Sequence, residues 1–417
     1  MELVWENRAS FGHLALGRHH PITFANDTHG FLLTGTTRSS LYTNDFLMYD
    51  ESTDTWSNLT NTPSAFPGMP RTLGYGVVFD DVTDTKAYLG FGWSSTGWLS
   101  DWWEFDMSSH IWKQLVDLPL PGRGHPAIIP VRTASGATEI HVGLGKGDTG
   151  DLNDWWSYDV ALDAWTQLLE FPAAARHHPF YFGIEGTAYV GLGHGSNFIG
   201  RDFYAYDVDS IGIGSNWRRE PDFISYKASD EVSVTSEGRV AGTQFSIKHP
   251  AHGVHDIDSV LTSRSLGFIL SGDGDDHSTM VEGEFHAFYP ARGNGEISQW
   301  RCLPPHPGKS RWAPGSFVMR GSARAYFMAG LERVNETFHA DLWRIDLSEL
   351  FQSTDVNNVP TFPAMKTGPP TVTDSDDLEE VLDLLRNNAS STNKQLLGTG
   401  YVTFILGIAI LIHFVLN

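Results

Sequence analysis

Short apolar strands separated by glycine-containing turns recur from residue 3 to residue 347. The second strand of each repeat ends in glycine, in the segments GFLLTG, AYLGFG, IHVGLG, AYVGLG, GFILSG and AYFMAG. A variable loop then leads to an acid and an aromatic-rich strand, as in SDWWEFDMSSHIW, and a tight turn leads to a strand with tryptophan. Apolar segments bounded by turn residues are typical of strands, so each repeat predicts four short strands.

The acid at the start of the third strand marks the period of the repeat. These acids are Asp45, Asp101, Asp154, Asp202, Glu284 and Asp341. The first three intervals between them are 56, 53 and 48 residues by difference of the residue numbers. One small sheet cannot bury its own faces, so a period of about 50 residues predicts sheets packed against one another, as in the blades of a propeller.

The two ends of the repeat region complement each other. Five repeats contain their own tryptophan strand, whereas the sixth ends at LWRIDLSELFQ without one. The segment LVWEN precedes the first repeat at the N-terminus. We therefore predict six blades, with Leu3–Trp5 as the outer strand of the last blade, because this pairing removes a free sheet edge.

The recurring aromatic residues and acids have a structural interpretation. We expect the aromatic residues to pack between neighbouring blades and the repeated aspartates to accept hydrogen bonds from backbone donors in turns. The aromatic residues are Tyr49, Phe105, Tyr158 and Tyr206, with Trp56, Trp112, Trp165 and Trp217.

Taken together, these features resemble the kelch-repeat family, within the superfamily of galactose oxidase-like propellers. In that family, glycines end the second strand and a tyrosine and a tryptophan lie a few residues apart. The resemblance covers residues 3–347 and implies an all-β, six-bladed kelch-type β-propeller closed by an N-terminal strand. Two features depart from the pattern: most glycine pairs are split, as in Gly191-Leu192-Gly193, and the fifth repeat has an insertion from about Arg218 to Ile247.

The charge of the chain limits its partners. It has 28 Lys and Arg against 50 Asp and Glu, a net charge of −22, so we do not expect it to bind nucleic acid. Cys302 is the only cysteine, which excludes a disulfide within the chain. Its predicted outer strand lies far from the axis, so the cysteine–tyrosine copper chemistry of galactose oxidase is not expected, nor is any other cofactor.

The candidate site follows from the resemblance, which implies that the inter-blade turns and the loops after the glycine strands open on one face. Basic and histidine-rich turns would place arginines there that could hold a carboxylate or phosphate. In the alternative, each arginine pairs with an aspartate of the adjacent blade and locks the propeller. The candidate binding residues are Arg18, His20, Arg71, Trp93, Arg123, His125, Arg176, His178, His194, His277 and Arg311, with His19, His177, His252, Lys146 and Asp273 close by.

Metal binding is not expected from the histidines. Adjacent residues of a strand point to opposite faces, so the two histidines of an HH pair cannot both ligate one ion. The loop GDGDDH lacks the length and terminal glutamate of a dedicated calcium loop. We therefore expect a propeller that binds a protein or glycan on its funnel face. The alternative is a carbohydrate-active enzyme acting on an acidic sugar, because bacterial sialic-acid mutarotases are also kelch propellers.

The C-terminal region has a different composition. Residues 348–398 predict a Pro/Ser/Thr-rich linker, with a short amphipathic helix in DLEEVLDLLRNN. Residues 399–417 predict an apolar helix that is either a transmembrane segment or a signal for a GPI anchor at Asn388. A GPI anchor implies the cell surface or a lumen, whereas a tail anchor implies a cytosolic propeller. The N-terminus shows no secretory signal, which favours the tail anchor unless residues upstream are missing. The sequons at Asn26, Asn58 and Asn335 permit glycosylation on the luminal side.

Overall fold

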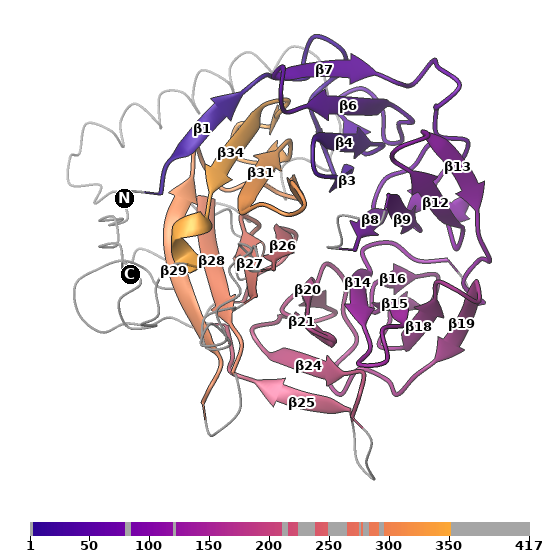
Figure 1. Ribbon diagram of the computed structural model, residues 1–417, viewed down its shortest axis with the longest axis vertical. Helices are drawn as coiled ribbons and strands as arrows, with labels where there is room; N and C mark the ends of the chain where they lie inside the picture. Colours follow the sequence, from indigo (N-terminus) through magenta and orange to yellow (C-terminus); the bar gives the residue numbers. More distant parts are fainter. Residues whose placement is uncertain are drawn as a thin grey trace, which may run out of the picture. The chain divides into compact units, whose positions relative to one another are not determined.

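The computed structural model describes residues 3–79, 85–119, 122–210, 216–223, 238–248, 265–274, 277, 283–291 and 296–351. Within these residues, six four-stranded antiparallel sheets surround a common axis (Figure 1). This arrangement confirms the predicted all-β, six-bladed propeller.

Each blade has the same strand order from the axis outward. The inner strands are β3 (Ile22–Ala25), β8 (Tyr75–Val78), β14 (Ala127–Arg132), β20 (Phe180–Ile184), β26 (Thr243–Ile247) and β30 (Gly315–Val318). The second strands are β4 (His29–Leu33), β9 (Lys86–Gly90), β15 (Thr138–Gly143), β21 (Thr187–Gly191), β27 (Leu266–Leu270) and β31 (Arg324–Met328). The third strands are β6 (Phe46–Asp50), β12 (Trp102–Asp106), β18 (Trp155–Asp159), β24 (Phe203–Asp207), β28 (Gly283–Tyr289) and β34 (Leu342–Asp346). The outer strands are β7 (Thr55–Asn58), β13 (Ile111–Gln114), β19 (Ala164–Gln167), β25 (Trp217–Glu220), β29 (Gln299–His306) and, in the sixth blade, β1 (Trp5–Arg8).

The sixth blade is completed by the N-terminal strand. Strand β1 pairs antiparallel with β34, from Trp5 opposite Ile345 to Arg8 opposite Leu342. The pairing confirms the predicted closure, although the strand begins at Trp5 rather than at Leu3. Leu3 is buried ahead of the strand, whereas Val4 is 58% exposed.

The split glycine pairs have a steric explanation in the fourth blade. A Cβ atom on Gly191 would lie 2.2 Å from the Asp202 carbonyl oxygen, so only glycine allows the third strand to approach this closely. Leu192 and Gly193 then both have positive φ, 54° and 81°, and a Cβ on Gly193 would lie 2.8 Å from the His177 carbonyl oxygen. The second glycine therefore allows a left-handed turn against the inter-blade segment.

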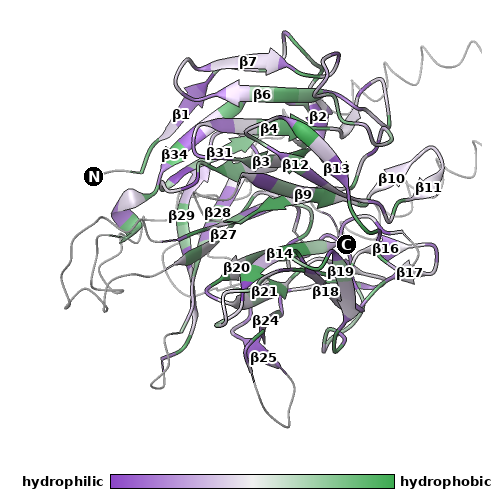
Figure 2. Cartoon of the chain, turned by 45° about the vertical axis from the view of Figure 1, so that its right-hand side comes forward, coloured by the Kyte–Doolittle hydropathy of each residue, from purple (hydrophilic) through white to green (hydrophobic). Residues whose placement is uncertain are grey.

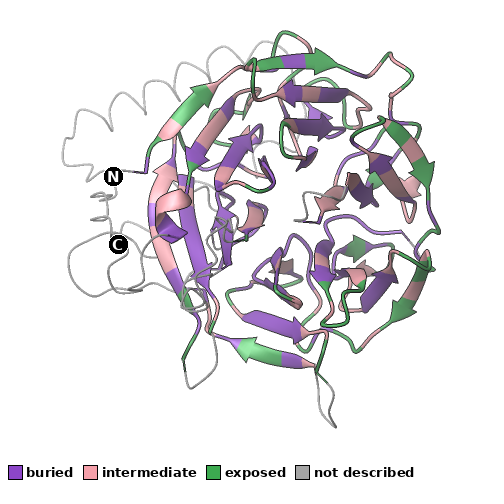
Figure 3. Ribbon diagram, viewed as in Figure 1, coloured by how far each residue is buried: buried purple, intermediate pink, exposed green. Residues whose placement is uncertain are grey.

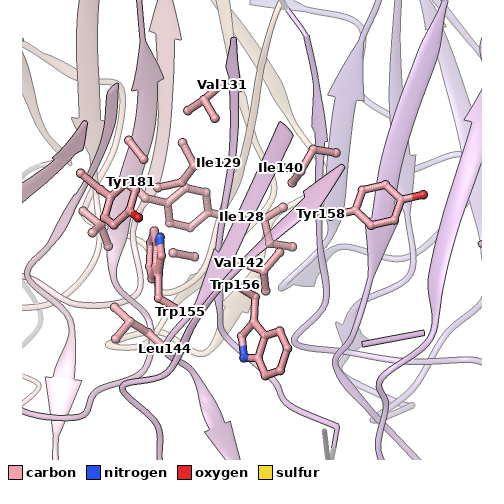
Figure 4. Packing of buried hydrophobic residues seen from close by; sticks show 14 of the residues in the cluster. Ile128, Ile129, Val131, Ile140, Val142, Leu144, Trp155, Trp156, Tyr158 and Tyr181 are labelled. Atoms are coloured by element: carbon pink, nitrogen blue, oxygen red, sulfur yellow. The ribbon is translucent and has the colours of Figure 1, made fainter. Parts of the chain in front are cut away.

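Aromatic side chains fill the space between blades, as predicted. The outer-strand residue Trp165 contacts Tyr158 in its own blade at 4.9 Å and Trp102 of the preceding blade at 5.8 Å between ring centroids. Its indole N–H donates to the Val116 carbonyl of that preceding blade. The second and third strands are largely buried, and the outer strands β7, β13 and β19 are exposed except at their tryptophan (Figure 3). Ile128, Val142 and Trp155 lie in the core cluster that includes the third blade (Figure 4).

A short 3-10 helix, η3 (Ser348–Phe351), follows the sixth blade. The predicted linker beyond Phe351, the apolar segment 399–417 and Asn388 lie outside the described residues, as does His252. In the part of the chain that the structure describes, no helix has the length and apolar character needed to cross a membrane.

Candidate functional site

The inter-blade segments and the loops after the second strands meet at one end of the propeller, which we call the hairpin face. Five two-stranded ribbons form there among the described residues. They pair β2 (Arg18–His19) with β5 (Thr36–Thr37), β10 (Trp93–Ser94) with β11 (Gly97–Trp98), β16 (Lys146–Gly147) with β17 (Gly150–Asp151), β22 (His194–Gly195) with β23 (Phe198–Ile199), and β32 (Leu331–Glu332) with β33 (Thr337–Phe338). Strands β10–β11 and β16–β17 project from the blades in Figure 2.

Each inter-blade segment contributes one buried arginine that pairs with the acid of its own blade. In the third blade, both terminal nitrogens of Arg123 lie 2.7 Å from the two carboxylate oxygens of Asp154, and Nη1 also donates to the Leu144 carbonyl. The six pairs are Arg18–Asp45, Arg71–Asp101, Arg123–Asp154, Arg176–Asp202, Arg239–Glu284 and Arg311–Asp341. The arginines therefore pair with acids as the alternative predicted, but each acid belongs to the same blade and not to the adjacent one, so the pair holds the inter-blade segment to its own blade.

These pairs also change the interpretation of the repeated aspartates. The acid before each third strand binds arginine, so for these acids the expected role as a turn acceptor is wrong. For the second aspartate of the repeat, at the end of the strand, that role is confirmed: the Asp106 carboxylate accepts from the backbone N–H groups of Ser108 and Ser109.

The burial of the arginines bears on ligand binding. Their side chains are at most 3% exposed, and their guanidinium groups are engaged by carboxylates and carbonyls. Burial alone would raise the pKa of Asp154, but the hydrogen bonds and charge of Arg123 outweigh burial and lower it. Ligand binding by Arg18, Arg71, Arg123, Arg176 and Arg311 stays a prediction, and this geometry does not favour it.

A circle of backbone hydrogen bonds joins neighbouring blades beside the arginines. In each blade the glycine two residues after the end of the second strand donates its N–H to the carbonyl of the arginine in the next blade. The six bonds run from Gly35, Gly92, Gly145, Gly193, Gly272 and Gly330 to Arg71, Arg123, Arg176, Arg239, Arg311 and Arg18. The last bond joins the sixth blade to the first, so the inter-blade segments are held rigidly.

Two residues after each arginine, the backbone is left-handed in all six blades. We call these residues the axial positions: His20, Leu73, His125, His178, Ala241 and Ala313, with φ between 44° and 63°. Their backbones bond to one another; for example, the N–H of His178 donates to the His125 carbonyl and the N–H of His125 to the Leu73 carbonyl. This conformation is uncommon for residues other than glycine, so the surrounding structure must impose it.

Three of the axial positions are histidines, and their rings meet. Nε2 of His20 lies 2.9 Å from Nε2 of His178, and the ring centroids of His125 and His178 are 3.3 Å apart. All three side chains are buried, with residue exposures of 4%, 6% and 5% for His20, His125 and His178. Burial, reinforced by the neighbouring imidazoles, lowers the pKa of each well below the ordinary value for histidine.

A second layer of side chains surrounds these histidines. His177 Nδ1 lies 2.7 Å from the Asp151 carboxylate, and burial lowers the pKa of His177 to about 4 in spite of that carboxylate. The rings of His194 and His277 are 4.5 Å apart between centroids. Trp312 lies 5.2 Å from the ring of His178. The predicted site residues His20, His125, His178, His194 and His277 are therefore brought together.

Trp93 lies in a different part of the hairpin face. Its ring stacks on Trp98 at 4.9 Å, and it is 40% exposed. Trp98 in turn lies against Gly124, where a Cβ would be 2.6 Å from the indole. Gly124 precedes His125, so Trp98 lies against the inter-blade segment that carries this histidine.

The inner strands enclose a cavity of about 550 Å³. All six contribute to its wall, which includes Tyr75, Tyr181 and Phe245. Burial raises the pKa of Tyr75 and Tyr181, so both phenols stay protonated. Of the three sequons, Asn58 and Asn335 are exposed and Asn26 is half-buried, with its side-chain oxygen accepting from the Thr28 N–H.

No family model and no curated protein matches the chain. The assignment to the kelch-repeat family therefore stays a prediction. Arg239, Trp98 and Trp312 were not predicted as site residues from the sequence. The insertion in the fifth repeat obscured the inter-blade turn that contains Arg239. Glu284, the acid that pairs with this arginine, was recognised from the sequence.

Proposed function

We propose that the protein is a membrane-tethered, kelch-type binding module that takes a protein ligand on its hairpin face. The observation that carries this proposal is a set of exposed apolar side chains on consecutive blades, which we call the apolar arc. It comprises Leu41, Met69, Trp93 and Val334, which are 56%, 37%, 40% and 63% exposed. Exposed apolar patches rimmed by polar residues mark interaction sites, and tryptophan is enriched at their centres.

The loops that carry the apolar arc are linked to one another. Val334 lies between β32 and β33 of the sixth blade, whose Glu336 carbonyl accepts from Arg38 of the first blade. Thr43 of the first blade bridges to Arg71 near Met69, and the Met69 sulfur accepts from Thr96 of the β10–β11 hairpin. The loops that carry the apolar arc are therefore joined across the sixth, first and second blades.

Replacement of Trp93 by alanine is expected to abolish capture of the ligand. Full-length protein, Trp93→Ala and Ile111→Ser would be used for affinity capture from a membrane extract of the source cells. Ile111 is 64% exposed on the outer strand β13, so its variant is a matched control away from the hairpin face. A tryptophan that is an interface hot spot contributes about 2 kcal/mol or more, so the purified ligand should bind Trp93→Ala at least about 30-fold more weakly.

Two results of this experiment would count against the proposal. If all three proteins capture the ligand equally, or if Ile111→Ser loses capture as Trp93→Ala does, the hairpin face does not bind the ligand. Binding of a purified glycan that is lost in Trp93→Ala, without any captured protein, would identify a glycan as the ligand. The acidic-sugar enzyme is not favoured, because the arginines that would hold such a substrate are engaged in ion pairs.

The membrane tether rests on the apolar composition of residues 401–416. We expect the full chain to sediment with membranes and a chain ending at Gly398 to be released into the soluble fraction. Release of the full chain by phospholipase C would indicate a GPI anchor, and retention would indicate a tail anchor. A truncated chain that still sediments with membranes would contradict the tether.

A further inference from the structure

The three axial histidines differ from the residues at the equivalent positions of the other blades. Leu73, Ala241 and Ala313 occupy the same left-handed backbone conformation in the second, fifth and sixth blades. The fold therefore accepts a small or branched apolar side chain at this position. Histidine is not needed for the backbone geometry, and the first, third and fourth blades nevertheless direct three imidazoles to one point.

The geometry of these imidazoles fits a single metal ion. Each offers one ring nitrogen, and the three nitrogens lie within 4.8 Å of one another. Bonds from zinc to imidazole nitrogen are about 2.0–2.1 Å long, so two ligands of a tetrahedral ion are about 3.3 Å apart. The 2.9 Å separation of the Nε2 atoms of His20 and His178 is already close to that value. Small rotations of the rings would bring all three nitrogens into range.

The hydrogen bonding of the cluster is incomplete. Nδ1 of His125 and Nδ1 of His178 are buried and have no hydrogen-bond partner among the described residues. A buried polar atom without a partner destabilises the fold by about 1–3 kcal/mol. Burial also keeps the three imidazoles neutral, which is the form that binds metal.

The surrounding side chains restrain the cluster as a second shell restrains metal ligands. Nδ1 of His20 contacts Nδ1 of His19, which leaves Nε2 directed at His178. Trp312 packs against His178, and its ring also lies 6.4 Å from His20. Such contacts fix the orientation of ligating imidazoles.

We propose that His20, His125 and His178 bind one divalent transition-metal ion on the propeller axis. Imidazole is a preferred ligand of zinc, copper and nickel, and three imidazoles leave at least one coordination position for water or an external ligand. The expectation of no metal was based on adjacent histidines of one strand. It does not apply here, because each of the three comes from a different blade.

Metal titrations of the full-length protein in detergent test this site, with Zn²⁺ followed by calorimetry and Co²⁺ by its visible absorption. We expect one equivalent per chain after treatment with a chelator. His20→Ala, His125→Ala and His178→Ala should each weaken binding more than about tenfold, since loss of even an outer-shell partner has an effect of this size. Leu73→Ala is the matched control, because it alters an axial position without removing a ligand, and it should bind as the wild type does.

If a histidine variant fails to fold, X-ray absorption of the wild-type zinc complex still tests the proposal, because it identifies the ligands of the bound zinc. Three imidazole ligands on the bound zinc are expected. Absence of stoichiometric binding to the folded wild-type protein would overturn the proposal, as would equal affinity in folded His125→Ala, His178→Ala and Leu73→Ala. A zinc site with fewer than three imidazoles would also contradict it.

Discussion

Deletion of residues 1–8 is expected to destabilise the whole propeller by at least about 4 kcal/mol. The deletion removes β1 and leaves β34 with an unpaired edge. It also removes Trp5, whose ring lies 5.7 Å from Phe285 of the fifth blade and 6.2 Å from Phe327 of the sixth. Trp5 is partly buried, so its loss reduces the free energy of unfolding by less than the ~3–5 kcal/mol of a fully buried tryptophan, and loss of the four residue pairs between β1 and β34 adds to this reduction. Denaturant unfolding of the truncated and full chains measures the difference.

Single substitutions separate the contribution of Trp5 from that of the strand. Trp5→Ala should account for most of the loss, whereas Val4→Ala should change the free energy of unfolding by less than about 0.5 kcal/mol because Val4 is 58% exposed. Coincident unfolding curves for the deletion and the full chain would show that closure of the sixth blade by β1 does not stabilise the fold.

Replacement of Asp154 by alanine is expected to reduce the free energy of unfolding by about 3–5 kcal/mol. The guanidinium group of Arg123 would then be a buried charge without its carboxylate, and this is more damaging than loss of the whole pair. The double variant Arg123→Met, Asp154→Leu should therefore recover part of the stability. Thermal and denaturant unfolding of the single and double variants provide the measurement.

The matched control is Arg219→Met, which breaks the ion pair between Arg219 and Asp222. Those side chains are 58% and 31% exposed, against 1% and 15% for Arg123 and Asp154. An exposed pair contributes at most about 1 kcal/mol, so the control should be nearly neutral. Equal effects of Asp154→Ala and Arg219→Met would show that burial of the ion pair does not add to its contribution to stability.

The number of blades, their four strands and the closure by the N-terminal segment were predicted from the sequence alone, and the structure confirms them. These features rest on local signals, namely glycine at the end of the second strand, an acid before the third and tryptophan in the fourth. Each signal recurs along the chain. The absence of a tryptophan strand from the sixth repeat can therefore be recognised in the sequence. The predicted bounds of this strand, Leu3–Trp5, were wrong: β1 runs from Trp5 to Arg8, because pairing with β34 and not the composition of the segment sets its position.

Only the tertiary structure shows which acid each arginine pairs with. Arg123 and Asp154 are 31 positions apart, and a linear pattern does not tell whether an arginine meets the acid of its own blade or of the next. Only the packing of the inter-blade segment against the start of the third strand brings them together. The same packing buries the arginines that the sequence had suggested for anion binding.

The meeting of His20, His125 and His178 also exists only in the closed propeller. His20 and His178 are separated by 158 positions, and the HH pairs indicate only that neighbouring side chains diverge. Six left-handed inter-blade turns direct the axial positions toward one axis, and histidine occupies three of them. The apolar arc likewise depends on the contact of the sixth blade with the first. Local patterns specify strands because they act over a few residues, whereas a site on the axis requires contacts that exist only after all six blades have joined.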